Sequence, residues 1–424
     1  MTDMEDKILN MAFTETWRWE RAINKAFDKG IPQVLLREVC DPHFRARLYA
    51  LIESGQYRIA PPHTAKIPKA DPGEFRTVYI NEGLDRVLLS LCNDLLFDLC
   101  PEMVHPACRS YQKGISCGNV VLDISHKIKM GYKGWKSDLS KYFDNVAIEL
   151  IDQAFDDVER KHGKSALIQV LRDYYHQDLY FDENNQLQSK YQSLKQGCAV
   201  ASWLADVILY PVDEVMYNRK DDNFNRYSDD AMYLSMSEER AAEAKEIFKK
   251  ELEKRKLTLN PKKVEDVIPG RWVTFLGYSL NGTMISISST GLKNFQQAID
   301  DAVKDKTDYN SALHAVYRTL YKGYNDYSWA TRILRVINVD RDINILNGYV
   351  MDALRTVITG KHKIGGLGYI KEQRGGCVAH GTGKNVRANR EKVPHLDNYY
   401  TIMCMANALR TNRSAFDMIV RTEM

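Results

Sequence analysis

The sequence predicts a mixed α/β fold in which helical regions flank a central series of short β-hairpins. Apolar residues recur at helical spacing near both ends of the chain, whereas turn-forming residues separate half-apolar strands in its middle. The chain has 424 residues, which is more than one hydrophobic core usually holds. We therefore expect two or three subdomains.

The N-terminal part is expected to begin with helices. Residues 4–30 carry their apolar side chains at the spacing of amphipathic helices. A segment rich in Pro and Gly then breaks regular structure. After it, residues 75–80 combine β-branched and aromatic side chains, which predicts a strand, and residues 84–99 predict an apolar helix.

The next elements alternate between strands and helices. Asp138 ends a predicted strand, and Asp144 is a favourable N-cap for a helical region over residues 145–180. The polar stretch DENN between apolar flanks predicts a hairpin at residues 181–194. Residues 196–216 are expected to form one mostly buried helix.

Two further hairpins and a helix complete the central region. RYSDDAMYLS, residues 226–235, has turn formers between half-apolar arms, and residues 273–288 are expected to turn at Asn281-Gly282. Between them, Ser237 precedes acidic residues, which is typical of the first turn of a helix. From about residue 290 the pattern is mainly helical.

Composition limits the class of protein. Hydrophobic content of 44% and charged content of 27% are ordinary for a globular protein, and a net charge of +3 does not by itself call for a nucleic-acid partner. None of the eight cysteines forms a Cys-x-x-Cys pair, which disfavours a zinc site. The charged N-terminus does not resemble a signal peptide, and no apolar run of about eighteen residues occurs. We therefore expect a cytoplasmic protein with reduced thiols and no membrane span.

Two adjacent aspartates, Asp229 and Asp230, lie in the hairpin RYSDDAMYLS. Their mutual repulsion raises the cost of keeping both ionised, more so near an apolar surface. A solvated turn would accommodate them, because Asp is a common turn residue. A divalent cation would also accommodate them by cancelling the repulsion, and Asp138, at the end of an upstream strand, could converge on the same site.

Several blocks of the sequence resemble, in the same order, those of bacterial reverse transcriptases related to retron, group II intron and phage-defence enzymes. They extend over about residues 58–280 and read IPKADPGEFRTVYINEGLDRVLL, RSYQKGIS, KSDLSKYFDNV, SLKQGCAVASWLADVILYPVD, RYSDDAMYL, LTLNPKKV and FLGY. The resemblance implies a right-hand polymerase with fingers, an antiparallel-sheet palm and an all-α thumb. It also implies RNA-directed DNA polymerase activity, in which dNTPs are joined on an RNA template to give a DNA product.

The resemblance gives expected domain boundaries. These are an N-terminal helical segment at 1–57, fingers at 58–130, a palm at 131–285 with a finger insertion at about 150–195, and a helical thumb at 286–424 with a basic loop at 360–392. That loop holds eight Gly, eight Lys or Arg and only two acidic residues. It is either a surface loop or a flexible arm that binds a nucleic-acid backbone.

By the resemblance, Asp138, Asp229 and Asp230 bind two Mg²⁺ ions and form the catalytic centre. The ions would activate the primer 3′-hydroxyl and hold the triphosphate. Lys263 resembles the lysine proposed as general acid toward the pyrophosphate, and the neighbouring Lys262 is an alternative match. For Asp230 a supporting structural role is the alternative.

The resemblance also implies a nucleotide site. Lys69 and Arg76 match the basic pair of the fingers that holds the dNTP phosphates. Phe143 matches the aromatic steric gate, whose ring clashes with a ribonucleotide 2′-hydroxyl and so favours DNA as product. Gln196 and Gly197 would lie against the nucleotide and template. Lys66 is a weaker phosphate-binding candidate, and a solvated surface lysine is its alternative.

Primer and template contacts are implied for Tyr227 of the hairpin and for Gly277 and Tyr278 of the FLGY turn. Farther on, the stretch VYRTLYKGYNDYSWATRILRVINV mixes aromatic and basic residues that could bind a structured RNA. Packing between helices is the alternative for its four aromatic positions, Tyr317, Tyr321, Tyr324 and Trp329.

The sequence departs from the family pattern at three positions. Lys195 replaces the usual Pro before Gln-Gly, Ser193 replaces an upstream Gly, and Asp206 replaces the closing Asn of that motif. The Asn-Ala-x-x-His and Val-Thr-Gly elements of retron enzymes are not found, and no nuclease or protease module is recognisable. These features favour a stand-alone defence-associated or abortive-infection enzyme.

The function that follows is antiphage defence by copying a partner structured non-coding RNA into DNA. One alternative is a template-independent or protein-primed DNA polymerase of the abortive-infection type. The other is a non-catalytic RNA-binding protein that kept the fold.

Overall fold

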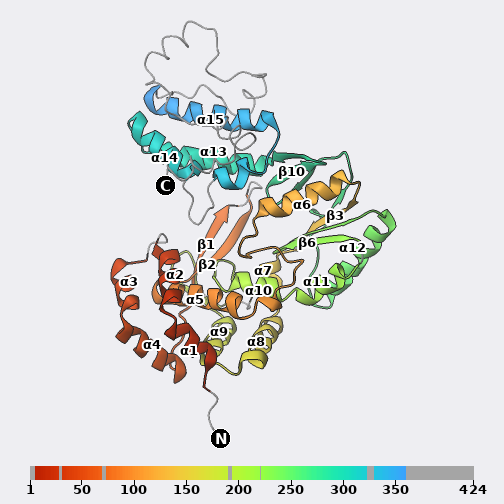
Figure 1. The fold of residues 1–424 in the computed structure, drawn as a ribbon. Helices are drawn as coiled ribbons and strands as arrows, with labels where there is room; N and C mark the ends of the chain where they lie inside the picture. The colour runs from red at the N-terminus through yellow and green to blue at the C-terminus, as the bar shows by residue number, and fades with distance from the viewer. Residues whose placement is uncertain are drawn as a thin grey trace. The chain divides into compact units, whose positions relative to one another are not determined.

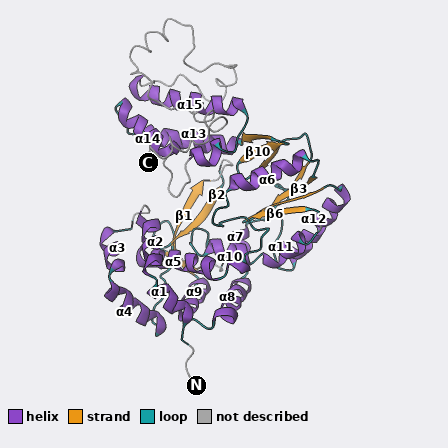
Figure 2. Ribbon diagram, in the orientation of Figure 1, coloured by secondary structure: helices purple, strands orange, loops and turns teal. Residues whose placement is uncertain are grey.

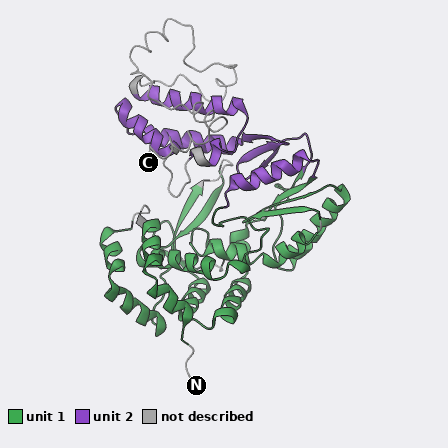
Figure 3. Cartoon of the chain, viewed as in Figure 1, with its two compact units in different colours: residues 1–114, 133–266 green, residues 115–132, 267–424 purple. Residues whose placement is uncertain are grey.

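The computed structural model describes residues 5–27, 31–68, 73–189, 193–219, 221–321 and 329–359. The chain forms two compact units (Figure 3). Unit 1 comprises residues 1–114 and 133–266, and unit 2 comprises residues 115–132 and 267–424. Residues 115–132, which the prediction assigned to the fingers, belong to unit 2, and the boundaries of fingers, palm and thumb stay predictions. No helix in the described ranges is long and apolar enough to cross a membrane.

Unit 1 combines helices with two four-stranded sheets (Figures 1 and 2). Its helices are α1 (Lys7–Thr14), α2 (Thr16–Phe27), α3 (Gln33–Cys40), α4 (Pro42–Glu53), α5 (Gly83–Leu99), η1 (Pro101–Met103), α7 (Tyr142–Asn145), α8 (Ile148–His162), α9 (Ala166–His176), α10 (Ala201–Val207), α11 (Tyr210–Tyr217) and α12 (Glu238–Glu253). The predicted helices near the N-terminus and over residues 84–99 are therefore confirmed.

The first sheet of unit 1 has the strand order β2-β1-β4-β5. Its strands are β1 (His63–Pro68), β2 (Phe75–Ile80), β4 (Leu179–Phe181) and β5 (Leu187–Ser189). The predicted strand at 75–80 is confirmed, and so is the hairpin around DENN, whose arms are β4 and β5. We call this sheet the fingers sheet.

The second sheet, the palm sheet, has the order β6-β7-β3-β8 and carries the aspartates. Its strands are β3 (Lys133–Asp138), β6 (Asn223–Tyr227), β7 (Asp230–Ser235) and β8 (Glu265–Val267). Helix α12 covers one face, where Trp135 stacks on Tyr233 with ring centroids 5.8 Å apart and contacts Phe248 at 5.2 Å. Ser237 caps α12, as predicted, because its side chain accepts a hydrogen bond from the Arg240 amide.

Two helix predictions were wrong in detail. Asp144 does not begin a helix: it lies inside the short α7, and α8 begins at Ile148 after Ala147. The single helix expected over residues 196–216 is divided into α10 and α11. Pro211 lies in the first turn of α11, where its missing N–H costs nothing, whereas it would break a ladder bond inside a continuous helix.

Unit 2 combines a three-stranded sheet, ordered β11-β10-β9, with helices. Its elements are α6 (Cys117–Lys129), β9 (Val273–Phe275), β10 (Tyr278–Asn281), β11 (Met284–Ile287), α13 (Ser289–Val303), α14 (Tyr309–Tyr321), η3 (Ala330–Leu334) and α15 (Asp340–Thr359). The β10–β11 hairpin and the helical pattern after residue 290 were predicted. Tyr317 is buried and Trp329 packs edge-on against Phe295, so these two aromatics take the packing role. The basic loop 360–392 and Tyr324 lie outside the described residues.

Candidate active site

Three carboxylates meet at one end of the palm sheet. Strands β6 and β7 pair with Tyr227 opposite Asp230, so Ser228 and Asp229 form the two-residue hairpin loop. Strand β3 lies on the other side of β7, with Asp138 opposite Asp230. The Leu139 amide also donates to the Asp229 carbonyl at 3.2 Å. The structure therefore brings together the three aspartates that the sequence singled out.

The carboxylates destabilise one another's charge. Burial, followed by repulsion from Asp230 and Asp138, raises the pKa of Asp229 to about 7. Burial and repulsion from Asp138 raise the pKa of Asp230 to about 6, although the ammonium groups of Lys263 and Lys136 oppose this rise. A cation bound between these carboxylates would relieve the repulsion between their negative charges.

Lys263 provides positive charge beside these carboxylates. Its Nζ lies 2.7 Å from Asp138 Oδ2, while its side chain remains 60% exposed. Burial lowers the pKa of Lys263, but the hydrogen bond and charge of Asp138 outweigh this and raise the pKa above its ordinary value. The Lys262 amide instead donates to Asn260 Oδ1 at 3.2 Å. Of the two lysines, Lys263 is therefore the one placed at the site.

Backbone pairing explains this placement. The Asn260 amide donates to the Asp138 carbonyl at 2.8 Å, and the Ser140 amide donates to Thr258 at 2.8 Å. The chain after α12 thus runs beside the end of β3. A turn closed by the Lys263 amide on the Asn260 carbonyl then returns Lys263 toward Asp138.

The donor set suits a hard divalent cation, which prefers carboxylate oxygens. Within the described ranges, however, no three His, Cys, Asp or Glu side chains form a ready metal cage. Lys263 occupies one oxygen of Asp138. The residues fit Mg²⁺ in charge and chemistry, and its binding would compete with the Lys263 ion pair.

The β6–β7 hairpin is anchored by a buried ion pair that the sequence did not reveal. Arg226 is fully buried and binds both carboxylate oxygens of Asp213, at 2.7 and 2.6 Å. The same guanidinium donates to the Ser228 carbonyl at 3.0 Å and to the Asp206 carbonyl at 2.8 Å. It therefore ties the hairpin loop to α10 and α11.

Ser110 makes a second connection to the same loop. Its hydroxyl accepts a hydrogen bond from the Ser228 amide at 2.9 Å and donates to Asp206 Oδ1. Asp206 is the residue that replaces the family's Asn, and burial raises its pKa to about 7. Ser228 has a φ of 56°, a left-handed conformation that these bonds stabilise.

The predicted nucleotide-binding turn lies against the fingers sheet. The Tyr79 amide donates to the Gln196 carbonyl at 2.7 Å. Gly197 has a φ of 104°, and a Cβ placed there would lie 2.8 Å from the Tyr79 carbonyl oxygen. Only glycine fits so close an approach. On the other side of the turn, the Leu194 amide bonds the carbonyl of the half-buried Phe143 at 3.0 Å.

The basic residues of the fingers are only partly described. Arg76 is exposed on β2, in register with Ile67 of β1. Lys69 lies outside the described residues. Lys66 is exposed and faces Glu183 at 3.6 Å, which fits a surface lysine.

A family model described as reverse transcriptase (RNA-dependent DNA polymerase) matches residues 67–280, half of the chain. The chain belongs to the reverse transcriptase family. The matched range contains the three carboxylates, Lys263 and the Gln196–Gly197 turn, and the reverse transcriptase fold expected from the sequence is confirmed. No curated protein matches this reverse transcriptase in sequence.

Among solved structures, this reverse transcriptase is similar to telomerases. The apo telomerase from Candida tropicalis is 12% identical with a TM-score of 0.46, and the match covers 72% of this chain and 58% of that one. Telomerase from Candida albicans in complex with a TWJ fragment of telomeric RNA is 12% identical with a TM-score of 0.42, covering 73% and 63%. The reverse transcriptase thus spans less than two thirds of the length of these chains.

The remaining predicted primer and template residues fall in both units. In unit 1, Tyr227 is half-buried and its ring lies 6.4 Å from that of Tyr111. In unit 2, Gly277 has a φ of 85° and its carbonyl accepts from Ser288. Tyr278 is buried and donates its hydroxyl to the Arg332 carbonyl at 2.6 Å, so any contact with primer would use its backbone.

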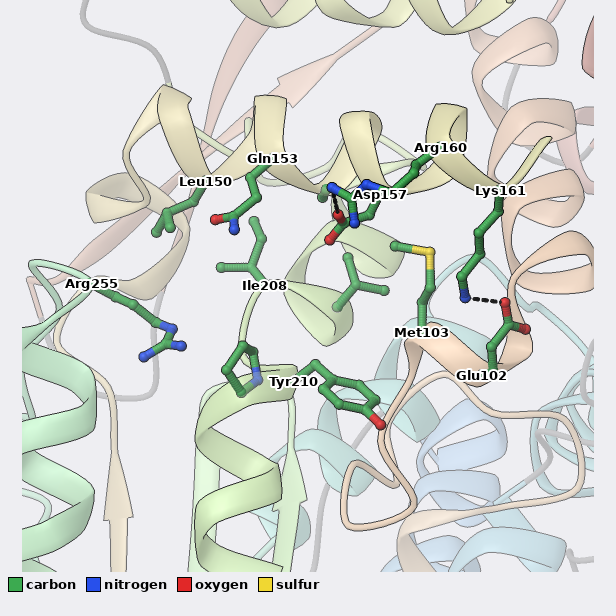
Figure 4. A pocket seen from close by; sticks show the side chains of 13 residues that line it. Glu102, Met103, Leu150, Gln153, Asp157, Arg160, Lys161, Ile208, Tyr210 and Arg255 are labelled. Atoms are coloured by element: carbon green, nitrogen blue, oxygen red, sulfur yellow. Dashed lines mark hydrogen bonds and ion pairs between the residues drawn. The ribbon is translucent and has the colours of Figure 1, made fainter. Parts of the chain in front are cut away.

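A separate pocket of about 510 Å³ lies in unit 1 of this reverse transcriptase (Figure 4). None of the predicted site residues lines it. Leu150, Ile208 and Tyr210 contribute apolar surface, and the Arg160–Asp157 ion pair lies at its edge.

The raised carboxyl pKa values predict a pH-dependent stability. Between about pH 4 and pH 7 the folded protein without divalent cations holds protons on Asp229 and Asp230 that the unfolded chain has released. Its free energy of unfolding should therefore fall as pH rises through this window, by about 1.4 kcal/mol per unit of pKa difference at most. Thermal melts with and without Mg²⁺ measure this. Mg²⁺ should raise the melting temperature more at about pH 8 than at about pH 5, because protons compete for the same oxygens.

The control for this measurement is Asp266→Asn, which alters an exposed carboxylate paired with Lys245. It should keep the full pH dependence, whereas Asp229→Asn should lose most of it. An equal Mg²⁺ effect at both pH values would show that the three carboxylates do not form the cation site.

Proposed function

We propose that the protein is an RNA-directed DNA polymerase whose catalytic centre is formed by Asp138, Asp229 and Asp230. The observation that carries this proposal is the meeting of the three carboxylates in register on β3 and the β6–β7 hairpin, within the part of the chain that matches the family. Two Mg²⁺ ions, when bound there, would supply the charge that activates a primer hydroxyl and stabilises the leaving pyrophosphate.

The surrounding residues have roles that follow from their placement. The carboxylates orient the cations and must lose their protons to do so. Lys263 carries a proton at neutral pH next to Asp138, which places a positive charge and a donor at the edge of the centre. Arg76, exposed on β2, is available to bind triphosphate oxygens together with Lys69. The Gln196–Gly197 turn presents backbone to the base pair being formed.

The template proposed is a partner structured non-coding RNA, and the biological role proposed is antiphage defence in the cytoplasm of a bacterium. Two features of the sequence support this lineage: the order of its blocks, and the basic Gly-rich stretch at 360–392, which suits an RNA backbone.

Isolation of the protein from its host, with its flanking locus, tests the proposal. A single structured RNA together with complementary DNA is the expected result. Homopolymeric or random DNA, or DNA attached covalently to the protein, would instead support the template-independent, protein-primed alternative. Recovery of RNA without any DNA would support a non-catalytic RNA-binding protein, provided that the Asp229→Ala, Asp230→Ala variant also retains full function in cells.

The steric-gate role of Phe143 makes a separate prediction about the sugar. Replacing Phe143 by Ala should let the protein incorporate ribonucleotides, raising the relative efficiency for rNTP over dNTP by about a hundredfold. Incorporation of each nucleotide on a defined RNA template measures this. The control is Ile148→Ala, which truncates a partly buried side chain farther along the same segment and should leave sugar selection unchanged. Equal selection in both variants would show that Phe143 is only a packing residue.

A further inference from the structure

Lys195 is a buried lysine directly before the Gln196–Gly197 turn. Only 5% of its surface is exposed, which is unusual for lysine. Its Nζ donates to the carbonyl oxygens of Tyr174 at 2.5 Å and Gln177 at 3.1 Å. The same ammonium lies 4.1 Å from the ring centroid of Tyr174. The contacts therefore hold the side chain in one place.

These carbonyls lie at the end of α9, where the last turn leaves oxygens without partners inside the helix. A cation at a helix C-terminus is favoured by both the free carbonyls and the helix dipole. Among described residues no carboxylate forms an ion pair with Nζ, although the charge of Asp178 acts on it. Burial lowers the pKa of Lys195 to about 8, so the group is still mostly protonated at neutral pH.

The backbone of the same residue begins the turn. The Cys198 amide donates to the Lys195 carbonyl at 3.0 Å, and Gly197 has positive φ, as in a type II turn. The residue before Lys195 bonds the Phe143 carbonyl, and the residue after it accepts from Tyr79 of β2. One side chain thus anchors a turn that joins the predicted steric gate to the fingers sheet.

The conformation of Lys195 explains why this anchor is needed. Its φ is 50°, a left-handed conformation that costs free energy for any residue with a Cβ. Proline, which the family usually has here, fixes φ near −65° and could not adopt it. The turn therefore has a backbone conformation that proline cannot stabilise, and the Nζ contacts to α9 are what stabilise it.

We infer that Lys195 is a positioning residue that fixes the Gln196–Gly197 turn against Phe143 and β2, and thereby sets the affinity for the incoming dNTP. This inference rests on the proposed polymerase function. Lys195 does not touch the nucleotide: it acts through the backbone of the residues that follow it.

The test replaces Lys195 by Met, which keeps the length of the side chain and removes the ammonium. The expected result is a KM for dNTP raised about tenfold with kcat within about twofold, because ground-state and transition-state binding are lost together. The control is Leu36→Ala, which opens a cavity in α3, a helix that packs on α2, α4 and α5. It should lower the active fraction without changing KM. An unchanged KM in Lys195→Met, or the same change in both variants, would overturn the inference.

Hydrogen exchange gives a readout that does not depend on activity. Peptides containing the amides of Tyr79, Leu194 and Cys198 should exchange about tenfold faster in Lys195→Met and at the wild-type rate in Leu36→Ala. Unchanged protection in Lys195→Met would contradict the inference, whether or not the protein synthesises DNA. Absence of DNA synthesis by the wild-type protein would instead contradict the proposed function alone. If Lys195→Met does not fold, Lys195→Gln is measured in the same way, with the same criteria and a smaller expected effect.

Discussion

Replacing Asp229 and Asp230 together by alanine is expected to reduce DNA synthesis at least about a thousandfold while the protein stays folded. The two carboxylates supply most of the negative charge that a divalent cation would bind, and cation-assisted stabilisation of a phosphoryl transition state amounts to several kcal/mol. Burial and repulsion between carboxylates raise the pKa values of both residues, so the substitution also removes the cost of keeping them ionised. The free energy of unfolding without Mg²⁺ at about pH 8 should therefore rise, by about 1–3 kcal/mol.

The substitution is expected to lower DNA synthesis and to raise the free energy of unfolding, and a purely structural role would not produce this combination. Primer extension on an RNA template measures DNA synthesis, and chemical denaturation measures the free energy of unfolding. Asp266→Asn is the matched control, because it removes one exposed carboxylate from β8, the edge strand of the same sheet, and should change neither quantity. Loss of activity accompanied by loss of stability would indicate a structural role for the pair. Retained synthesis would exclude these residues from the catalytic centre.

Replacing Arg226 by Met is expected to lower the free energy of unfolding by about 3–5 kcal/mol. The reason is that Asp213 would remain fully buried with its charge uncompensated. The Ser228 carbonyl would also lose a donor, so the Ser228–Asp229 loop should loosen and DNA synthesis should fall even in the folded fraction. Denaturant titration together with primer extension measures both effects.

A surface ion pair provides the comparison. Arg160→Met breaks the pair with Asp157, in which the arginine side chain is 73% exposed, and should cost at most about 1 kcal/mol. The double variant Arg226→Met, Asp213→Leu removes both buried charges and should recover much of the lost stability. If it recovers stability but not activity, the guanidinium positions the loop. If Arg226→Met lowers the free energy of unfolding no more than Arg160→Met does, the buried ion pair stabilises the protein no more than a surface ion pair.

The parts of the fold that could be predicted are those encoded locally. The β6–β7 hairpin follows from turn formers between half-apolar arms, and the Ser237 cap follows from its position before acidic residues. Asp138 could be placed at a strand end for the same reason. Convergence of the three aspartates needed the family resemblance, because nothing in the spacing specifies that β3 pairs with β7.

The parts that could not be predicted depend on partners distant in sequence. Arg226 reads as an ordinary strand residue, and only the fold shows that Asp213 is buried opposite it. Choosing Lys263 over Lys262 required the pairing of the chain after α12 with the end of β3. The sequence marked Lys195 only as a departure from the family, since its left-handed backbone and its contacts with α9 are tertiary features.

Helix α6 has a consequence for how the chain is made. It belongs to unit 2, where its apolar face is buried and its Ser125 hydroxyl bonds the Gly282 carbonyl, yet it is synthesised between two halves of unit 1. On the ribosome α6 emerges long before β10, which it contacts in the folded protein, because the strands of the palm sheet are synthesised in between. Such long-range closure slows folding and leaves an apolar helix open to aggregation. A chain shortened after residue 266 would retain this uncovered helix permanently, so this truncation should yield insoluble protein.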